Sequence, residues 1–441
     1  MPDDWNRFQL YAERVRELSL IGDLDLGADF LKMIKCYFPR GKPVFPYLRT
    51  VQFLRNNTDA EFVLCLSTLL HPGVQAVETF PPSTDSMAAM LSYMQLRCPD
   101  VQQLCITKAT GLLPMFDLFS QLRTLDYDNP EDSVNLHLIL PLARLPRLRK
   151  LTITSRFTSS LHTEPSTGAL RLFPSLEDLS LENIRSLQAV SDLLRRVHSP
   201  SLHFVSFAYN KAPKAKDLRD LSSSLSPHEQ LHILSLKSRH LPDNSIKVAD
   251  LGDLLRLKRL TEVRLTDVLC PSSMDAAAIG ALTCEWNDLH TLHIECKPWH
   301  EPSKRDAVCV PNVAVLGSLA VNCPHLQHLH LALSTAYIPE RCNLDNPAQR
   351  RDVPLRLSIC TVSGSSNEGN AHEVAEYISD IYPHIDISYE TTSVSGVTLR
   401  AQWEEIKRIL ALMARIRPAE RRRVELEMLE LVERVCRTST K

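Results

Sequence analysis

The sequence predicts an α/β solenoid, in which repeated strand-and-helix units build a parallel sheet covered by helices on one side. Three observations support this fold class: a short apolar phrase that recurs along most of the chain, helical periodicity between its copies, and prolines at the junctions. Repeat arrays grow as one structure, so the length of 441 residues does not by itself imply several domains.

The recurring phrase has the pattern L-x-x-L-x-L, as in FPSLEDLSLENI at residues 173–184. Aligned on the first apolar position, its copies begin at Val15, Leu48, Val74, Val101, Leu122, Leu148, Leu176, Leu202, Leu231, Leu260, Leu289 and Leu326. From Leu48 to Leu326 ten intervals span 326 − 48 = 278 residues, a mean near 28, and single intervals run from 21 to 37. This period is typical of leucine-rich repeats, and we expect about twelve irregular copies.

The phrase predicts a short strand because alternate side chains of a strand point to opposite faces. Between the strands, helical periodicity is found at 61–70, 87–96, 189–197, 248–257 and 313–321. Each repeat is therefore one strand and one helix. Stacked repeats form a horseshoe, with a parallel sheet on the concave side and helices on the convex side.

Prolines mark the junction between each helix and the next strand. They stand at 46, 72, 99, 146, 174, 200 and 324, within the spelling F/C/S-P-x-L or a close variant. Proline cannot continue a helix and biases the preceding residue toward an extended backbone. Cys98 and Cys323 directly precede two of these prolines, and we expect both to be small buried apolar fillers.

The solenoid is expected to cover residues 1–390 and to end in a degenerate repeat. This last repeat consists of LRLSIC (355–360), a helical HEVAEYISDIY (372–382) and IDISY (385–389). Residues 391–441 are expected to form a helical segment that caps the array, with one helix at 401–417, a stop at Pro418 and a second helix at 419–437. In the second helix Val424, Met428, Leu431 and Val435 form an apolar stripe, so a dimerisation helix is the alternative to a cap.

Composition and charge exclude several classes of protein. With 50 basic and 52 acidic side chains the formal net charge is −2, which does not favour nucleic acid or a membrane surface as a partner. The amino terminus lacks the pattern of a secretory signal, and no run reaches the ~20 apolar residues of a membrane span. The twelve cysteines include no C-x-x-C pair. We expect a monomer in the cytoplasm or nucleus.

No motif for catalysis or cofactor binding is present in the sequence. Only 12 residues are glycine, and G-x-G-x-x-G, G-x-x-x-x-G-K and G-x-S-x-G are absent. We therefore expect no enzyme activity, no catalytic residue and no cofactor. An enzyme-class alternative, a leucine-rich-repeat GTPase-activating protein, would need a catalytic residue on a loop, and the sequence does not identify one.

Histidines are concentrated in two adjacent copies of the phrase. His293 and His330 occupy the same position of their copies, so they are expected side by side on the concave face. A metal site needs a third convergent ligand, which the sequence does not show, and we expect no metal there. A partner-contact or pH-sensitive patch and a plain solvated strand face remain open.

The residues between the core leucines are the candidates for partner contact. Phe204 and Tyr209 are expected to be exposed near the middle of the concave face, where an aromatic side chain among small polar ones is a candidate hot spot. Packing against a neighbouring strand is the alternative. The predicted protein-binding residues are Lys150, Asp178, Phe204, Tyr209, Arg264, His293 and His330.

The opening DDWNRFQLYAERVRELSL (3–20), the F/C-P-x-L-x-x-L-x-L phrases and the closing WEEIKRIL together resemble the leucine-rich-repeat region of fungal F-box proteins. The matching residues of the opening are Trp5, Arg7, Phe8, Tyr11, Ala12, Arg14, Val15 and Arg16. The resemblance implies a substrate receptor of a cullin-RING ubiquitin ligase, whose F-box docks a Skp-type adaptor while the repeats hold the substrate.

The F-box of this family needs roughly forty residues before the repeats, and only four precede Trp5. We therefore expect no F-box in this chain, and a Skp-type adaptor only if one lies upstream. The function predicted is a non-enzymatic protein-interaction scaffold, the substrate-recognition part of such a receptor. A stand-alone leucine-rich-repeat adaptor without ligase recruitment is the alternative.

Overall fold

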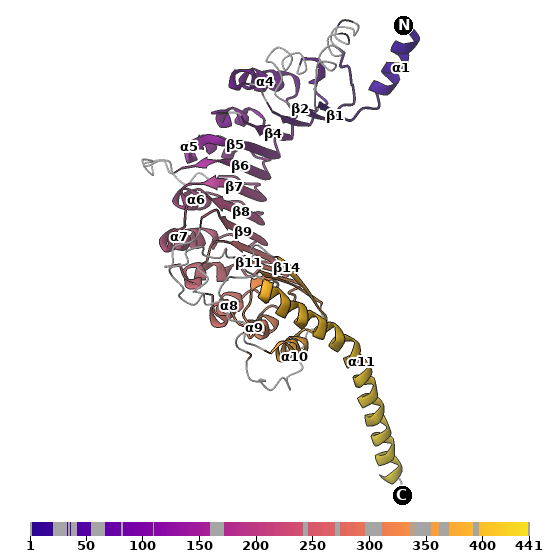
Figure 1. Ribbon diagram of the computed structural model, residues 1–441. Coiled ribbons are helices and arrows are strands. Elements are labelled where there is room, and N and C mark those ends of the chain that lie inside the picture. Colours follow the sequence, from indigo (N-terminus) through magenta and orange to yellow (C-terminus); the bar gives the residue numbers. More distant parts are fainter. Residues whose placement is uncertain are drawn as a thin grey trace. The chain divides into compact units, whose positions relative to one another are not determined.

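In a computed structural model of the chain, the described residues contain fourteen strands, which follow one another in chain order in a single open sheet (Figure 1). The structure describes residues 2–20, 33, 36, 42–53, 67–80, 83–108, 110–158, 172–240, 246–269, 274–295, 311–335, 338, 354–360, 370–390 and 397–439. Every strand pair with a defined register is parallel. The predicted α/β leucine-rich-repeat solenoid is confirmed.

The chain divides into two compact units, the first made of Met1–Lys211 and Ser223–Leu231. Its strands are β1 (Glu17–Leu20), β2 (Thr50–Phe53), β3 (Ala76–Thr79), β4 (Gln103–Thr107), β5 (Thr124–Val134), β6 (Lys150–Phe157), β7 (Asp178–Ile184) and β8 (Phe204–Tyr209). Its helices are α1 (Pro2–Ala12), α4 (Thr84–Arg97), α5 (Leu136–Ile139) and α6 (Leu187–Leu194), with 3-10 helices η1 (Leu113–Leu118) and η2 (Leu142–Arg144).

The second unit is made of Ala212–Ser222 and His232–Lys441, and the residues of α7 (Ala215–Leu225) are divided between the two units. Its strands are β9 (Ile233–Ser238), β10 (Glu262–Thr266), β11 (Thr291–Glu295), β12 (His328–Ala332), β13 (Leu355–Cys360) and β14 (Ile385–Glu390). Its other helices are η3 (Val248–Arg256), α8 (Ala276–Thr283), α9 (Val315–Asn322), α10 (Ala371–Ile381) and α11 (Val397–Ser439).

The phase of the strands follows the apolar phrase. Each of β1 to β12 begins two residues after the first apolar residue of its copy, as β7 begins at Asp178 after Leu176. Leu176, Leu179 and Leu181 are buried, while Asp178 and Ser180 between them are half-buried. Alternation along the strand therefore sends the leucines into the core and the intervening residues to the opposite face.

A tight turn precedes most of the strands. The N–H of the first apolar residue donates to the carbonyl three residues earlier, at 3.1 Å from Leu48 to Phe45 and 3.2 Å from Leu326 to Cys323. The same bond closes in ten of the twelve copies, those beginning at Val15, Leu48, Val74, Val101, Leu122, Leu176, Leu231, Leu260, Leu289 and Leu326. Where proline is present it is the second residue of this turn, the position that its fixed φ favours. Cys98 and Cys323 are buried at the first position, as expected.

The helices begin at residues that cap their free N–H groups. The side chains of Ser83, Ser186, Asp275 and Asn370 accept hydrogen bonds from the first turns of α4, α6, α8 and α10. The segment at 248–257 is helical as predicted, but η3 is a 3-10 helix and not an α-helix, with hydrogen bonds that span three residues. Most of the segment at 61–70 lies outside the described residues.

The last repeats are more regular than predicted. The segments expected to form one degenerate repeat are β13, α10 and β14, and they continue the parallel register of β12. Arg356, Leu357 and Ser358 of β13 lie opposite His328, Leu329 and His330 of β12.

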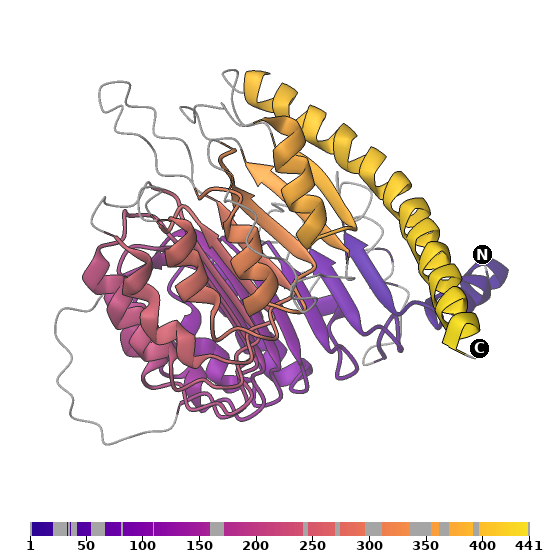
Figure 2. The same ribbon diagram turned by 90° about the horizontal axis from the view of Figure 1, so that it is seen from below.

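The predicted stop at Pro418 is wrong, because α11 is one continuous helix of 43 residues. An internal proline removes one backbone hydrogen bond and strains the preceding turn, and here the helix continues despite this cost. The first half of α11 packs beside α10 and β14 (Figure 2), with Trp403, Ile406 and Leu410 buried. Of the predicted apolar stripe, Met428 is exposed, and the side chains of Val424, Leu431 and Val435 lie outside the description.

Polar contacts fix this half of α11. Lys407 donates through Nζ to the carbonyl of Ile387 at 2.7 Å, and the Tyr389 hydroxyl donates to the carbonyl of Trp403 at 3.1 Å. Arg417 pairs with Asp380 of α10 at 2.6 Å.

Among the helices in the described part of the chain, none combines the length and the apolar character needed to cross a bilayer.

Candidate functional site

In the first unit α4, α5 and α6 lie on one side of the strands (Figure 1), and the other side carries the residues between the core leucines. We call this side the strand face. Its side chains form rows in register across the strands. The first row is Thr50, Ala76, Gln103, Thr124, Lys150, Asp178 and Phe204; the second is Gln52, Glu78, Cys105, Asp126, Thr152, Ser180 and Ser206; the third is Thr107, Asp128, Thr154 and Glu182.

Five carboxylates gather on the strand face between β3 and β7. They are Glu78, Asp126, Asp128, Asp178 and Glu182, which we call the acidic cluster, and Lys150 is the single basic residue in the three rows. Burial raises the pKa of Asp126, and the charges of Asp128, Glu182 and Glu78 raise it further against the opposing effect of Lys150. Burial also raises the pKa of Asp128, while Lys108 opposes the shift. Ionised Asp126 and Asp128 therefore oppose folding.

Cys105 lies within the acidic cluster, between Glu78 and Asp126 in the second row. Burial and the surrounding carboxylates raise the pKa of its thiol to about 12. Nucleophilic catalysis by cysteine requires the thiolate. Cys105 therefore lacks the environment of a catalytic cysteine.

The raised pKa of Asp126 predicts a pH-dependent gain in stability when the charge is removed. In the unfolded chain the pKa is near 3.8, so above its higher folded-state pKa the ionised carboxylate destabilises the fold. This destabilisation is present at neutral pH, decreases as the pH falls through the folded-state pKa, and ends below 3.8. We expect Asp126→Asn to have a higher free energy of unfolding than the wild type near neutral pH, measured by urea denaturation, and this gain to disappear toward about pH 4.

Comparison with the wild type at each pH removes other titrations from this measurement. Burial lowers the pKa of His71 and of His228 below 6.5, so both side chains destabilise the fold as the pH falls below 6.5 in either protein. An equal difference between Asp126→Asn and the wild type at both pH values would contradict the assignment of the effect to the Asp126 charge.

Three predicted contact residues of the first unit lie on the strand face. Lys150 is exposed, and Asp178 and Phe204 are half-buried beside it in the same row. The Asp178 carboxylate lies 3.3 Å from Nε2 of His203. The three residues thus place a base, an acid and an aromatic ring next to one another at the start of β6, β7 and β8.

The prediction for Tyr209 is wrong, because its side chain is only 1% exposed. Tyr209 has the same parity in β8 as Val205 and Phe207, both of which are buried. The strand continues beyond the L-x-x-L-x-L phrase, and this parity directs Tyr209 into the core.

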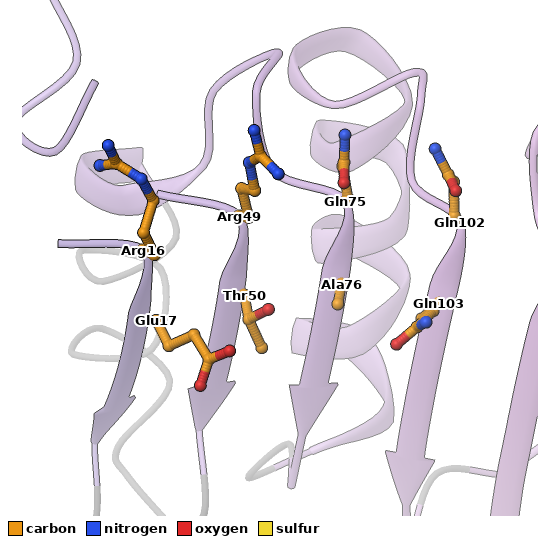
Figure 3. Close-up of a pocket in the computed structure, with 8 residues that line it drawn as sticks. All are labelled: Arg16, Glu17, Arg49, Thr50, Gln75, Ala76, Gln102 and Gln103. Atoms are coloured by element: carbon orange, nitrogen blue, oxygen red, sulfur yellow. The ribbon is translucent and has the colours of Figure 1, made fainter. Parts of the chain in front are cut away.

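A cavity of about 420 Å³ lies at the amino-terminal ends of β1 to β4. Arg16, Arg49, Gln75 and Gln102 stand side by side along its edge, one from each repeat (Figure 3). Sequence reasoning missed this edge, although each of these residues is the second of its phrase. The arrangement presents two guanidinium and two amide groups and could contact an acidic or polar part of a partner.

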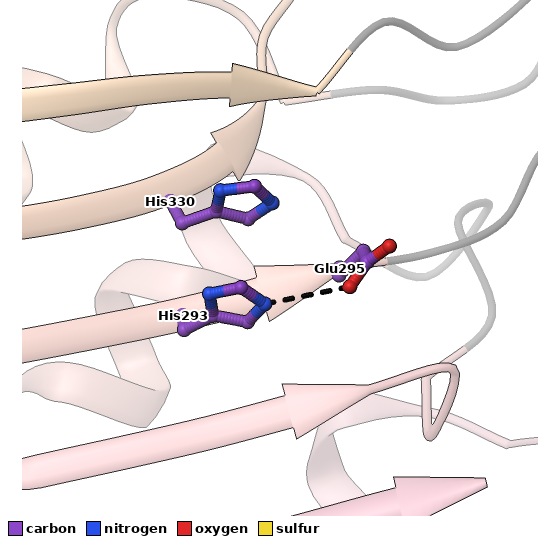
Figure 4. Close-up of side chains that lie close together, drawn as sticks. All are labelled: His293, Glu295 and His330. Atoms are coloured by element: carbon purple, nitrogen blue, oxygen red, sulfur yellow. Dashed lines mark ion pairs between the residues drawn. The ribbon is translucent and has the colours of Figure 1, made fainter. Parts of the chain in front are cut away.

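In the second unit Arg264, His293 and His330 occupy one row across β10, β11 and β12. Arg264 is exposed and pairs with Glu262 of its own strand. His293 and His330 lie side by side as predicted, with stacked rings 4.0 Å apart and 6° from parallel (Figure 4). His330 is buried at 6% exposure, which corrects the interpretation of a plain solvated face for this residue.

The sequence analysis missed a residue next to this histidine pair. Glu295 follows His293 by two residues in β11, so it shares the same face, and its carboxylate lies 3.5 Å from Nε2 of His293. The sequence signal for Glu295 is its spacing of two residues from His293, because alternate residues of a strand lie on the same face.

The repeat, its strand phase and the parallel sheet define the chain as a leucine-rich-repeat solenoid. No protein-family model matches the chain, and no curated protein matches it. Among solved structures the chain is similar to a leucine-rich-repeat protein of Leptospira interrogans, with a TM-score of 0.38 and 14% identity over 87% of this chain and 98% of that one.

Two further solved structures are similar. One is a chain of the Rad7 and Elc1 complex in yeast, with a TM-score of 0.41 and 12% identity over 89% of this chain and 92% of that one. The other is the leucine-rich-repeat ectodomain of the plant membrane receptor kinase GASSHO1/SCHENGEN3 from Arabidopsis thaliana, in complex with Casparian strip integrity factor 2. Its TM-score is 0.32 and its identity 14%, over 79% of this chain and 42% of that one.

Proposed function

We propose that the chain is a non-enzymatic protein-interaction scaffold that binds a partner on the strand face of the first unit. The observation that carries this proposal is the set of half-exposed side chains that β2 to β8 hold in register on the side away from α4, α5 and α6 (Figure 1). These residues do not belong to the core, so they can differ in chemistry without changing the fold.

The acidic cluster indicates the charge of the partner. Burial disfavours the ionised forms of Asp126 and Asp128, and the neighbouring carboxylates add repulsion at Asp126, so a cation placed near these two residues would stabilise their ionised forms. A protein segment rich in lysine or arginine would supply such cations. Phe204 at the edge of the face adds an aromatic contact, and Arg264 remains a proposed contact residue in the second unit.

Neutralising the acidic cluster is expected to weaken this binding. A short lysine-rich peptide serves as the probe, with its affinity for the full chain measured by fluorescence anisotropy at several salt concentrations. The variant Asp126→Asn with Glu182→Gln should bind about fivefold more weakly, as the loss of two ion pairs of about 0.5 kcal/mol each would produce. The affinity of the wild type should fall as the salt concentration rises.

The matched control is Asp117→Asn, because Asp117 is an exposed carboxylate on η1 in the same unit but not on the strand face. Its affinity for the peptide should equal that of the wild type. Equal weakening by Asp117→Asn would mean that the net charge, and not the strand face, attracts the peptide. No binding by the wild type at low salt would reject a basic partner.

We also propose a ligase context: the bound protein is a ubiquitination substrate, and the chain is the substrate-recognition part of an F-box-type receptor acting in the cytoplasm or nucleus. Support comes from the resemblance of the opening segment, which forms α1 and attaches to the first repeats. Trp5 and Phe8 stack at 5.3 Å, and Phe8 meets Phe45 edge-on at 6.2 Å. Depletion of the chain from cells should lengthen the half-life of the protein that binds the strand face.

An unchanged half-life would support the stand-alone adaptor in place of the receptor. Co-purification of a Skp-type adaptor with this chain alone would contradict the expectation that the chain has no F-box. Stimulation of GTP hydrolysis by the purified chain would overturn the non-enzymatic assignment and support the GTPase-activating alternative.

A further inference from the structure

His293, Glu295 and His330 converge on the face of the second unit that carries the residues between the core leucines (Figure 4). One nitrogen from each imidazole and one carboxylate oxygen all lie within 4.8 Å of one another. Within the described part of the chain this is the one place where three such ligands meet. We propose that these three residues bind a divalent transition-metal ion, and that this ion is zinc.

The parallel register of the sheet produces this arrangement. His293 and His330 are direct partners across β11 and β12, and neighbouring strands lie about 4.8 Å apart. Their rings therefore stack, at 4.0 Å between centroids and 6° between planes, so the two imidazoles extend from the sheet in the same direction. A metal ion beyond the ring edges can meet a nitrogen of each without any movement of the backbone.

Glu295 completes the set from the same strand as His293. Its carboxylate already lies 3.5 Å from Nε2 of His293, and it supplies the negative charge that a divalent cation needs. Zinc binds imidazole nitrogen at about 2.0–2.1 Å and carboxylate oxygen at about 2.0–2.2 Å, so tetrahedral ligands lie about 3.3 Å apart. Rotation of the half-buried Glu295 and His293 side chains can bring the ligand atoms to this spacing.

Burial and neighbouring charge define the surroundings. His330 is buried, while the side chains of His293 and Glu295 are 28% and 27% exposed, so solvent reaches these two ligands. Arg264 is the partner of His293 on β10, but it pairs with Glu262. Ser358 is the partner of His330 on β13. Three protein ligands leave a fourth tetrahedral position for water or for a group of a bound molecule.

Zinc binding by the purified full chain, prepared without a polyhistidine tag and stripped with a chelator, tests this proposal. Isothermal titration with Zn²⁺ should show one saturable site per chain, and Co²⁺ should give the visible absorption of a tetrahedral site. The variants His293→Ala and Glu295→Gln should each lower the zinc affinity at least tenfold, because removing even a group that only supports a metal ligand typically lowers it about 10- to 100-fold.

His325→Ala is the matched control. His325 stacks on His290 at 5.8 Å between ring centroids in the same two repeats, and it belongs to no group of three ligands in the described residues. Its affinity for zinc should equal that of the wild type. Absence of saturable zinc binding, or an equal loss in His325→Ala, would overturn the proposal. Glu295→Gln removes no buried side chain, so its zinc affinity decides the question even if His293→Ala fails to fold.

Discussion

Leu179→Asp is expected to unfold several repeats of the first unit. Leu179 is 1% exposed and is the second residue of β7, where it pairs with Leu151 and Val205 of the neighbouring strands. An aspartate there would be buried without a partner, at a cost of several kcal/mol (roughly 2–7 for an unbonded polar group and more for a charge). Because each repeat is stabilised mainly by its neighbours, we expect loss of structure to extend over several repeats.

The control for Leu179→Asp is the same residue placed one position later. Ser180 lies on the strand face and is half-buried, so Ser180→Asp should change the free energy of unfolding by less than about 1 kcal/mol. Any cost should come from repulsion by Asp126 and Glu182, and Ser180→Asn should remove it. Urea denaturation followed by circular dichroism measures all three variants. Equal destabilisation by Leu179→Asp and Ser180→Asp would contradict the strand phase.

Trp403→Ala is expected to release α11 from the last repeat. Trp403 is 1% exposed and is among the largest fully buried side chains of the described chain. Its truncation should lower the free energy of unfolding of the second unit by about 3–5 kcal/mol, through lost burial and the cavity that remains. The hydrogen bond from the Tyr389 hydroxyl is accepted by the backbone carbonyl of residue 403, so it can persist in Trp403→Ala. It should not make up for the lost burial of the indole ring.

Limited proteolysis and thermal melting measure this release. We expect cleavage within α11 to become faster in Trp403→Ala, because the helix would lose its buried anchor. Leu412→Ala is the control, since Leu412 lies on the same helix at 56% exposure and its truncation removes little burial. Unchanged melting of Trp403→Ala would show that α11 contributes nothing to the stability of the second unit, against its predicted role as a cap.

The strands could be located from the sequence because each strand alternates buried and exposed residues, and the apolar phrase shows this alternation directly. Every strand from β1 to β12 begins two residues after the predicted start of its phrase, although single intervals vary from 21 to 37 residues. The signal is strong because the apolar positions are buried in nearly every copy. A helix gives a weaker signal, which is why 248–257 was identified as helical but its 3-10 geometry was not.

The candidate sites were harder to predict because the strands are longer than the phrase that identifies them. The phrase L-x-x-L-x-L covers only the first two rows of the strand face, and the structure adds a third row six residues after the phrase begins. Asp128, Glu182 and Glu295 all stand at this offset. The next position returns to the core, and this is where Tyr209 lies. Extending the alternation by two residues beyond the phrase would have placed Asp128, Glu182 and Glu295 on the exposed face and Tyr209 in the core.

Pro418 shows a different limit of sequence reasoning. Proline is a strong local signal against helix, yet α11 continues through it as one helix of 43 residues. The preference of proline against helix gives the local cost in free energy. It does not include the stabilisation that the other residues of the helix provide.

The tight turn that precedes most of the strands explains how such uneven spacing between repeats is tolerated. The bond from the first apolar N–H to the carbonyl three residues earlier is made within one repeat and involves only backbone atoms. Each repeat therefore restarts its alignment at the turn, whatever the length of the segment that led there. Insertions and deletions between strands remain local events, and an error in one repeat does not accumulate along the chain. The array can thus acquire new loops over evolutionary time while its rows of surface residues stay aligned.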